Sequence, residues 1–362
     1  MAEVPEPGEL SEWGLYDPSG PGAPELLRLL NFVFSLGAKR NEVERALATG
    51  RLTALALDLS ISPSTESLEL STLDRENGAD PIGVWWSALG LPNEQTMPLR
   101  VTTDAAHALE VFAGLADLVG REAALDVARV VGSSAARMAE ALAWATRTRV
   151  EIPRLDSGVS YADVVEEYTV VGREALPEFL NALNAVFRRH LVVVASQLWS
   201  TDEDRAAIQL ERTVGFADLV GSTAVMGQSS PAQIAAMVRS FEALVWALVT
   251  EVGGRVVKVI GDEAMFVVND PVSAVEVARR LVAESTTPVR VGLAAGQVIG
   301  FFGDYYGDTV NLAARLVHIA DDAGIVVSES VRDGSDSIDF VALPPMSLKG
   351  FAQSIPVFRV PA

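Results

Sequence analysis

Two aspartates in the second half of the chain each follow a short apolar run and lie close to a glycine. Asp218 closes the run in RTVGFADLVGST, and Asp262 follows the run in KVIGDEAMFVV. Apolar runs of this length predict buried strands, and the glycines predict tight turns at their ends. Mg²⁺ takes one or two protein carboxylates and completes its coordination with water and phosphate oxygens. The pair therefore predicts a two-metal phosphate site, although either aspartate taken alone also fits an ordinary turn former.

A third stretch, GDYYGDTVNLAAR, adds an amide and a cation. Asn311 and Arg315 are four residues apart, so a helix would place both on one face. Such a pair can hold a sugar oxygen and a phosphate, because arginine offers a rigid fork of donors. Asp304 precedes this helix on the loop that leads to the same site. Taken alone, the stretch also fits an amphipathic helix with a surface arginine.

The elements that must position these residues alternate between strands and helices. After a polar linker at 201–211, the pattern predicts a strand, a helix, a hairpin around Asp262, a second helix and a further strand. This β-α-β-β-α-β order is typical of the split ferredoxin-like unit. Its first and third strands tend to be neighbours, which would bring Asp218 close to Asp262. A helix at about 309–320 and three short strands are expected to follow.

Residues 1–200 show a different sequence pattern. They predict helices rich in Ala, Leu and Val and contain no recognisable group of catalytic residues. We expect an all-α regulatory or dimerisation domain at 1–200 and an α+β catalytic domain at 201–362. The early helices around residues 24–50 also fit a helix-turn-helix DNA reader. The formal net charge of −20 disfavours that interpretation, because binding nucleic acid depends on neutralising phosphates with Lys and Arg.

Finer expectations for the helical half concern where its elements begin and end. Residues 1–24 predict a loosely held arm, and residues 152–160 predict a loop. Asp104 is expected to cap a helix, and Gly120 and Gly132 are expected to break the helices. From residue 171 towards 200 the pattern predicts one long helix or a helix pair.

Composition excludes several other classes of protein. The chain has no cysteine, so neither disulfides nor thiolate-bound zinc contribute. Its N-terminus is acidic and lacks the basic and apolar regions of a signal peptide. No run of about twenty apolar residues lacks charge, so we expect no membrane span. A cytoplasmic enzyme fits these features best.

Four stretches taken together resemble the catalytic domain of the class III nucleotidyl cyclases. They are FADLVGST, KVIGDEAMFVV, RVGLAAGQVIG and GDYYGDTVNLAARL, in this order, within Arg212 to Gly350. The helical half is similar in general texture to that of actinobacterial cyclases with a soluble regulatory domain. The resemblance implies a palm-type, ferredoxin-like catalytic domain. It also implies an adenylyl cyclase that converts ATP to 3′,5′-cyclic AMP and pyrophosphate.

The resemblance also assigns a role to each candidate residue. Two Mg²⁺ or Mn²⁺ ions per site would be held by Asp218 and Asp262. Asn311 would orient the ribose, and Arg315 would stabilise charge on the α-phosphate. The remaining substrate-binding positions are a purine-reading pair and a triphosphate-binding lysine: Lys258 with Asp304, and Lys349. Because the family builds its site across two subunits and this chain carries all positions, a head-to-tail homodimer with two sites is implied.

Several alternatives and regulatory expectations stay open. A guanylyl cyclase, a diguanylate cyclase related through IGDE, and a nucleotide-binding sensor without catalysis are the alternative functions. Lysine and aspartate suit adenine's N1 acceptor and N6 donor, which favours ATP. His190, beside Arg188 and Arg189, would make the linker helix pH-dependent, because histidine titrates near neutrality. A hydrophobic ligand of the helical bundle is a further expectation.

Overall fold

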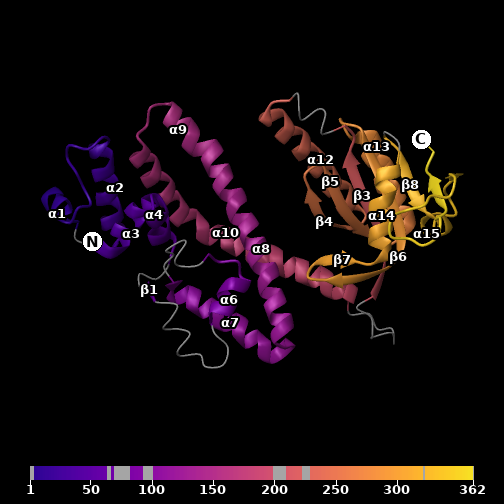
Figure 1. Cartoon of the computed structure of the whole chain (residues 1–362), viewed down its shortest axis with the longest axis horizontal. Helices are drawn as coiled ribbons and strands as arrows, with labels where there is room; N and C mark the ends of the chain where they lie inside the picture. The colour runs from indigo at the N-terminus through magenta and orange to yellow at the C-terminus, as the bar shows by residue number, and fades with distance from the viewer. Residues whose placement is uncertain are drawn as a thin grey trace. The chain divides into compact units, whose positions relative to one another are not determined.

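The computed structural model describes residues 4–62, 67–68, 82–92, 101–198, 209–221, 229–320 and 323–361. Most of the expected linker, together with Ser222 and Thr223 of the first motif, lies outside these ranges. The chain divides into two compact units, Met1–Thr201 and Asp202–Ala362. Figure 1 shows a helical first unit, coloured indigo to magenta, and a second unit built around a sheet, coloured orange to yellow.

In its described residues the first unit is helical apart from one short strand pair, Ser67–Leu68 (β1) with Val101–Thr102 (β2). Its helices, in chain order, are α1 Pro7–Glu12, α2 Ala23–Ser35, α3 Arg40–Ala48, α4 Leu52–Ile61, α6 Ile82–Ala88, α7 Thr103–Val119, α8 Arg121–Thr146, the π-helical turn η1 Arg147–Glu151, α9 Ile152–Asp156 and α10 Tyr161–Leu198. Two separate apolar cores hold them together. One joins α1 to α4 with the start of α10, and the other joins α6, α7 and α8.

The expectation of a loosely held N-terminal arm was wrong. Residues 7–12 form α1, in which Leu10 is fully buried, and Leu15 is buried just after it. The Trp13 ring lies 6.2 Å from the ring of Phe34 on α2. Proline and glycine at the start of this segment suggested disorder, but they occupy the first turn of a helix, where proline is tolerated because its missing N–H would have no partner.

Two details of α7 and α8 also differ from expectation. The cap of α7 is Thr102, whose side chain accepts a hydrogen bond from the Ala105 N–H, and Asp104 lies one residue inside the helix. Gly120 does separate α7 from α8, but Gly132 lies inside α8. A Cβ at Gly132 would come within 2.2 Å of the Leu89 carbonyl oxygen, so this glycine permits close packing rather than ending the helix.

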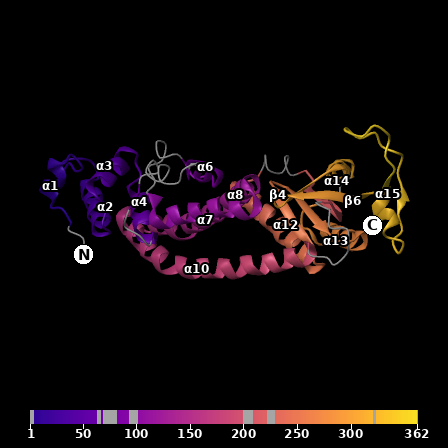
Figure 2. The ribbon, with the colours of Figure 1, turned by 90° about the horizontal axis from the view of Figure 1, so that it is seen from below.

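The segment before α10 is also more helical than expected. Residues 147–156, which include most of the expected loop at 152–160, form η1 and α9. Of the two expected forms, one long helix or a helix pair, the structure has the single continuous helix. It begins at Tyr161, ten residues before the expected start at residue 171. Pro177 lies inside it. Figure 2 shows α10 along its full length. Its first turns enter the core through Ala162 and Val165, whereas no apolar residue after Pro177 is buried within the described part of the helix.

The second unit contains an eight-stranded mixed sheet in the order β4-β5-β3-β6-β8-β10-β9, with β7 paired to β6. Among the described strand pairs of this unit, only β6–β8 is parallel. The strands are β3 Gln209–Leu219, β4 Arg255–Ile260, β5 Glu263–Val268, β6 Val289–Phe301, β7 Asp304–Tyr306, β8 Ile325–Ser328, β9 Val341–Ala342 and β10 Val357–Arg359. The helices are α12 Pro231–Glu251, α13 Pro271–Glu284, α14 Asp308–Ile319 and α15 Glu329–Asp333. The β-α-β-β-α-β order runs from β3 to β6, and the first strand neighbours the third, as expected.

Helices cover both faces of this sheet. On one face, Ala217 and Leu219 of β3 share a core with Phe241 of α12 and Ala278 of α13. On the other face, Val214 and Phe216 of β3 share a core with helix α14. Side chains alternate between the faces with a period of two, so Asp218 belongs to the α14 face. The functional candidates must therefore be sought on that face.

Among the described residues, α12 is the one helix that is long and apolar enough to cross a membrane. Its Val245, Leu248 and Val249 are buried within the core of the second unit. A helix that packs on a sheet shows the same length and composition, so this feature is weak support for a membrane span.

Candidate active site

A row of three charged side chains crosses three neighbouring strands on the α14 face. Asp218 on β3 lies directly opposite Glu263 on β5 and directly opposite Arg290 on β6. The Arg290 Nε and Nη2 atoms both donate to Asp218 Oδ2, at 2.8 and 2.5 Å. Asp262 lies in the turn that precedes Glu263, and its carbonyl oxygen accepts a hydrogen bond from the Leu219 N–H at 3.2 Å. The structure therefore brings the two predicted metal-binding aspartates to the same end of adjacent strands.

Negative charge accumulates at this end of the sheet. Burial raises the pKa of Glu263, and the Asp218 and Asp262 carboxylates raise it further, whereas His318 and Arg290 act in the opposite direction. Like charges directly opposite each other in a sheet are destabilising. Arg290, on the neighbouring strand β6, offsets this repulsion with its positive charge. Neither Glu263 nor Arg290 was predicted as a site residue, because only the strand register shows that they face Asp218.

The donor set fits hard divalent cations. Asp218 and Asp262 offer carboxylate oxygens, which Mg²⁺ and Mn²⁺ prefer. Burial raises the pKa of Glu263 most, and the Asp218 and Asp262 carboxylates raise it further; a bound cation would offset the part that comes from these charges. Within the described ranges, no group of three or more acidic, His or Cys side chains could hold a metal by itself. Two aspartates with water and phosphate oxygens match the way Mg²⁺ is commonly bound beside a nucleotide.

The predicted purine-reading pair forms a direct contact. Lys258 Nζ lies 2.5 Å from Asp304 Oδ2, and both side chains are partly exposed. A β-bulge between Val256 and Lys258 places Lys258 opposite Met265, on the α14 face of the sheet. Without that bulge the alternation of side chains would turn the lysine to the opposite face. The Arg255 Nη2 atom donates to the Gly303 carbonyl at 2.6 Å, which fastens the β6–β7 hairpin beside β4.

Asn311 and Arg315 both lie exposed on α14, one turn apart. Neither side chain forms a hydrogen bond or an ion pair with another described residue, so both are available to a ligand. Gly292 on β6 lets this helix lie close to the sheet. A Cβ at that position would come within 2.2 Å of the Val317 N and 2.6 Å of the Ala313 O, both in the backbone of α14.

Two of the sequence candidates lie elsewhere. Lys349 is exposed in a turn at residues 349–350, and no contact within the described ranges joins it to the other candidates. His190 is exposed on α10, in the first unit. Beside it on the same helix, Arg188 Nε donates to Asn184 Oδ1 at 3.2 Å.

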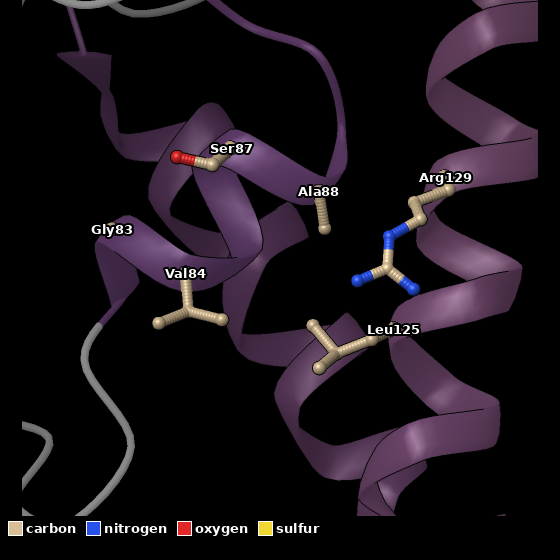
Figure 3. A pocket seen from close by; sticks show the side chains of 6 residues that line it. All are labelled: Gly83, Val84, Ser87, Ala88, Leu125 and Arg129. Carbon is tan, nitrogen blue, oxygen red and sulfur yellow. The ribbon is translucent and has the colours of Figure 1, made fainter.

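The helical unit has a pocket of about 440 Å³ between α6 and α8. It is lined by Gly83, Val84, Ser87, Ala88, Leu125 and Arg129. Figure 3 shows the Arg129 guanidinium pointing from α8 towards α6. That guanidinium is ion-paired with Asp126, so the cation at this pocket already has a partner. Nothing else in the described residues supports the expected hydrophobic ligand.

Comparison with known proteins places this geometry in a family. Residues 209–359 match the family model of the adenylate and guanylate cyclase catalytic domain. An uncharacterised protein of Mycobacterium tuberculosis is 32% identical over 340 residues, covering 92% of this chain and 89% of its own length. An adenylate cyclase of Streptomyces coelicolor is 33% identical, covering 69% of this chain and 66% of its own length. A pH-sensitive adenylate cyclase of M. tuberculosis is 30% identical, covering 41% of this chain and 40% of its own length. The chain belongs to the class III adenylate and guanylate cyclases, and it is an enzyme of the adenylate cyclase type.

Proposed function

We propose that this protein converts ATP to 3′,5′-cyclic AMP and pyrophosphate. The observation that carries the proposal is the placement of Asp218 and Asp262 side by side, on a sheet that also presents the Lys258–Asp304 pair. The β-α-β-β-α-β order with the first and third strands adjacent supports a ferredoxin-like, palm-type catalytic domain at 201–362. Incubation of the full chain with ATP and Mn²⁺, followed by identification of the product, tests the proposal directly.

The reaction forms one bond and breaks one bond. The ribose O3′ attacks the α-phosphorus, the bond from that phosphorus to the bridging oxygen of the β-phosphate breaks, and the 3′-hydroxyl proton is lost to solvent or to a phosphate oxygen. Such a displacement depends on positioning and on neutralising charge more than on covalent help. Two divalent ions bound by Asp218 and Asp262 would activate the 3′-hydroxyl and anchor the triphosphate.

The chain's own cations and amide supply the remaining interactions. Arg315 would donate to the α-phosphate oxygens as charge develops there, and Asn311 would hold a ribose oxygen. Arg290 adds a further cation beside Asp218. Lys349, exposed in the turn at 349–350, would contact the triphosphate. Loss of a cation directed at the transition state lowers the rate by on the order of a hundredfold or more.

The two residues that would contact the purine base favour ATP over GTP as the substrate. The Lys258 ammonium donates hydrogen bonds and would address the adenine N1 acceptor, while the Asp304 carboxylate would accept from the N6 amine. Their 2.5 Å contact shows that both groups reach the same point in space. Replacing Lys258 with methionine should lower kcat/KM for ATP by roughly tenfold or more, since a hydrogen bond to a charged group contributes about 1.5–3 kcal/mol. An unchanged preference for ATP over GTP in that variant would count against the assignment.

We also propose that the active form is a homodimer, with the aspartates from one subunit and the lysine, asparagine and arginine from the other. Large apolar side chains at the tip of the β6–β7 hairpin support an interface there, because Phe301, Phe302 and Tyr306 are 40–50% exposed. Single surface apolar residues are common, but three at one hairpin mark an interaction surface. A monomer would then hold no complete site.

Complementation between two inactive variants tests this arrangement. Asp218→Asn and Arg315→Ala should each be nearly inactive, because every site in either homodimer lacks one group. Co-expression should restore about a quarter of wild-type activity, because half of randomly formed dimers are mixed and each has one intact site. Asp218→Asn with Asp262→Asn is the control pair. One subunit contributes both aspartates to a site, so every site in a mixed dimer lacks one of them and this pair should not complement. Failure of the first pair to complement would contradict the shared site.

A nucleotide-binding sensor without catalysis and a diguanylate cyclase are the alternatives. Both retain a metal–nucleotide site, but neither yields 3′,5′-cyclic AMP. The product assay separates the three, because a sensor returns ATP unchanged and a diguanylate cyclase consumes GTP to give a dinucleotide. A guanylyl cyclase is distinguished by the same assay with GTP.

We further propose that the helical unit, residues 1–200, regulates the catalytic unit and that His190 makes this regulation pH-dependent. The similarity to a relative named as a pH-sensitive adenylate cyclase supports the idea. Histidine changes charge near neutrality, and on α10 the guanidinium groups of Arg188 and Arg189 would add to the repulsion once it is protonated. Replacing His190 with alanine should flatten the activity–pH profile, whereas replacing His107, whose Nδ1 lies 3.6 Å from Glu110 Oε2 on α7, should not. An unchanged profile in the His190 variant would remove this role.

A further inference from the structure

Asp304 lies at the tip of a hairpin whose turn is unfavourable on its own. Phe301 on β6 pairs with Asp304 on β7, so Phe302 and Gly303 form a two-residue turn. Both turn residues have positive φ, 53° for Phe302 and 73° for Gly303. Such turns join antiparallel strands well, but positive φ is uncommon for a bulky residue such as phenylalanine. Because β7 has only three residues, the hairpin needs further contacts to hold Asp304 in place.

Arg255, on β4, contacts the residues on both sides of Asp304. Its Nη2 atom donates to the Gly303 carbonyl at 2.6 Å, and its guanidinium carbon lies 5.9 Å from the centre of the Tyr305 ring. Tyr305 is buried in the core that β3 shares with α14, so the guanidinium meets a fixed ring. A cation at this distance is attracted by the ring. Arg255 thus fastens the backbone before Asp304 and the side chain after it.

These contacts also join the two halves of the base-reading pair. Lys258 lies on β4, three residues after Arg255, and Asp304 lies on β7. The two strands are not neighbours in the sheet, because β5, β3 and β6 lie between them in the strand order. Side chains join them instead: Lys258 contacts Asp304, and Arg255 contacts Gly303 and Tyr305. The position of Asp304 relative to Lys258 therefore depends on Arg255.

A bound purine would change the balance between these contacts. Asp304 Oδ1 accepts from the Tyr305 N–H at 2.8 Å, which leaves Oδ2 to face Lys258. To address the adenine N1 and N6 atoms, the ammonium and the carboxylate must exchange their hydrogen bond to each other for hydrogen bonds to the base. The direct contact between Lys258 and Asp304 then weakens. The contacts of Arg255 remain, and they hold the hairpin beside β4.

We propose that Arg255 is a positioning residue that determines base specificity, because it holds Asp304 where the carboxylate accepts from the N6 amine of adenine. Arg255 acts through the Gly303 backbone and the Tyr305 ring rather than by touching the substrate. The inference rests on the base-reading role proposed above for Lys258 and Asp304. A group that its neighbours already hold in place loses less conformational freedom on binding than a group that the ligand must order.

Two substrates separate this role from a general effect on the fold. Purine riboside 5′-triphosphate has a hydrogen in place of the N6 amine of ATP, so it keeps the atom that Lys258 would address and lacks the group that Asp304 would address. Arg255→Met should lower kcat/KM for ATP roughly tenfold, because the hydrogen bond from N6 to a charged carboxylate is misaligned. It should leave kcat/KM for the purine analogue nearly unchanged. An equal loss with both substrates overturns the proposal, since such damage does not act through Asp304.

Three further variants define how the effect arises. Arg255→Lys keeps a donor for the Gly303 carbonyl and should recover part of the preference for ATP over the purine analogue. Arg239→Met removes an exposed arginine from α12, on the other face of the sheet, and should change neither substrate. In an Asp304→Ala background, Arg255→Met should have no further effect on ATP, because the carboxylate that it positions is gone. Additive losses would show that Arg255 acts independently of Asp304.

Equilibrium binding to the full chain measures the same preference without turnover. The probes are the α,β-methylene analogues of ATP and of purine riboside triphosphate, in which the bond that must break is replaced. An inactive protein that prefers the adenine analogue, and loses this preference in Arg255→Met, refutes the proposed activity alone. An active protein whose preference survives Arg255→Met refutes the role of Arg255 alone. A wild type that binds both analogues equally removes the base-reading role and the role of Arg255 together.

Discussion

The contact between Arg290 and Asp218 gives the sharpest prediction. Replacing Arg290 with glutamine removes the cation that faces Asp218 and leaves that carboxylate opposite Glu263. Asp218 is 8% exposed, so water compensates little for the lost partner. We therefore expect the variant to be destabilised when no metal is present. Because a divalent ion would neutralise the same carboxylate, it should restore most of the lost stability.

The magnitude follows from the two hydrogen bonds. Each hydrogen bond to a charged group contributes about 1.5–3 kcal/mol, and breaking a buried ion pair costs about 3–5 kcal/mol. The Arg290 side chain is 29% exposed, which favours the lower end, about 3 kcal/mol. For the second unit, residues 202–362, each kcal/mol shifts Tm by roughly 2–4 °C, so the shift should be about 6–12 °C.

Thermal unfolding in EDTA and in Mn²⁺, followed by circular dichroism, measures both effects. Arg280→Gln is the matched control, because Arg280 forms ion pairs with Glu251 and Glu284 on the surface of the same unit, where such pairs contribute little. We expect a low Tm for Arg290→Gln in EDTA and a larger gain on adding Mn²⁺ than for the wild type. If the variant and the wild type melt together in EDTA, or gain equally from Mn²⁺, the carboxylates do not form a metal site that Arg290 offsets.

Two glycine substitutions test packing away from the chemistry. Gly292→Ala should push α14 from the sheet, lowering stability by about 1–3 kcal/mol and also lowering activity, whereas Gly300→Ala on the same strand meets only ordinary contacts and should change neither. Gly132→Ala should destabilise the helical unit by a similar amount in denaturant unfolding, because its Cβ would strike the Leu89 carbonyl. Gly114→Ala, in an open part of α7, should instead stabilise that unit by about 0.5–1 kcal/mol. If Gly292→Ala and Gly300→Ala had equal stability, or Gly132→Ala and Gly114→Ala did, the packing argument would be refuted.

The order of elements in the second unit could be predicted from sequence because its signals are local. Ser230 followed by Pro231 predicts a helix start, and Ser230 Oγ accepts a hydrogen bond from the Gln233 N–H at 3.3 Å. Gly261 next to Asp262 predicts a hairpin, and these two residues separate β4 from β5. Once the first and third strands are neighbours, the proximity of Asp218 and Asp262 follows from topology alone.

Features that depend on register could not be predicted in the same way. Arg290 and Glu263 face Asp218 because three strands are aligned to the residue, and no spacing within one strand reports that alignment. The bulge at Val257 is a second case. A regular strand would place Lys258 on the face covered by α12 and α13, so sequence alone leaves its contact with Asp304 unexplained.

In the helical half, predictions based on single glycines and prolines also failed. The low helix propensity of glycine predicts that a helix ends at Gly132. Gly132 instead lies inside α8, because only a residue without a Cβ can pack this closely against the Leu89 carbonyl. Proline and glycine at residues 7–8 suggested an arm, but the burial of Leu10 holds α1 in the core. In each case a tertiary contact overrides a local preference.

The position of the acidic site is itself a consequence of packing. Val214 and Phe216 point to the α14 face, and Ala217 and Leu219 point to the opposite core. A slip of β3 by one residue would reverse every side chain and drive Asp218 into the apolar core beneath α12 and α13. An unpaired buried carboxylate costs several kcal/mol, and the slip would also expose the apolar residues to the site face. The same alternation that forms the two cores therefore fixes the two aspartates at one end of the sheet, where Arg290 offsets the charge of Asp218 and a bound metal ion would do the same.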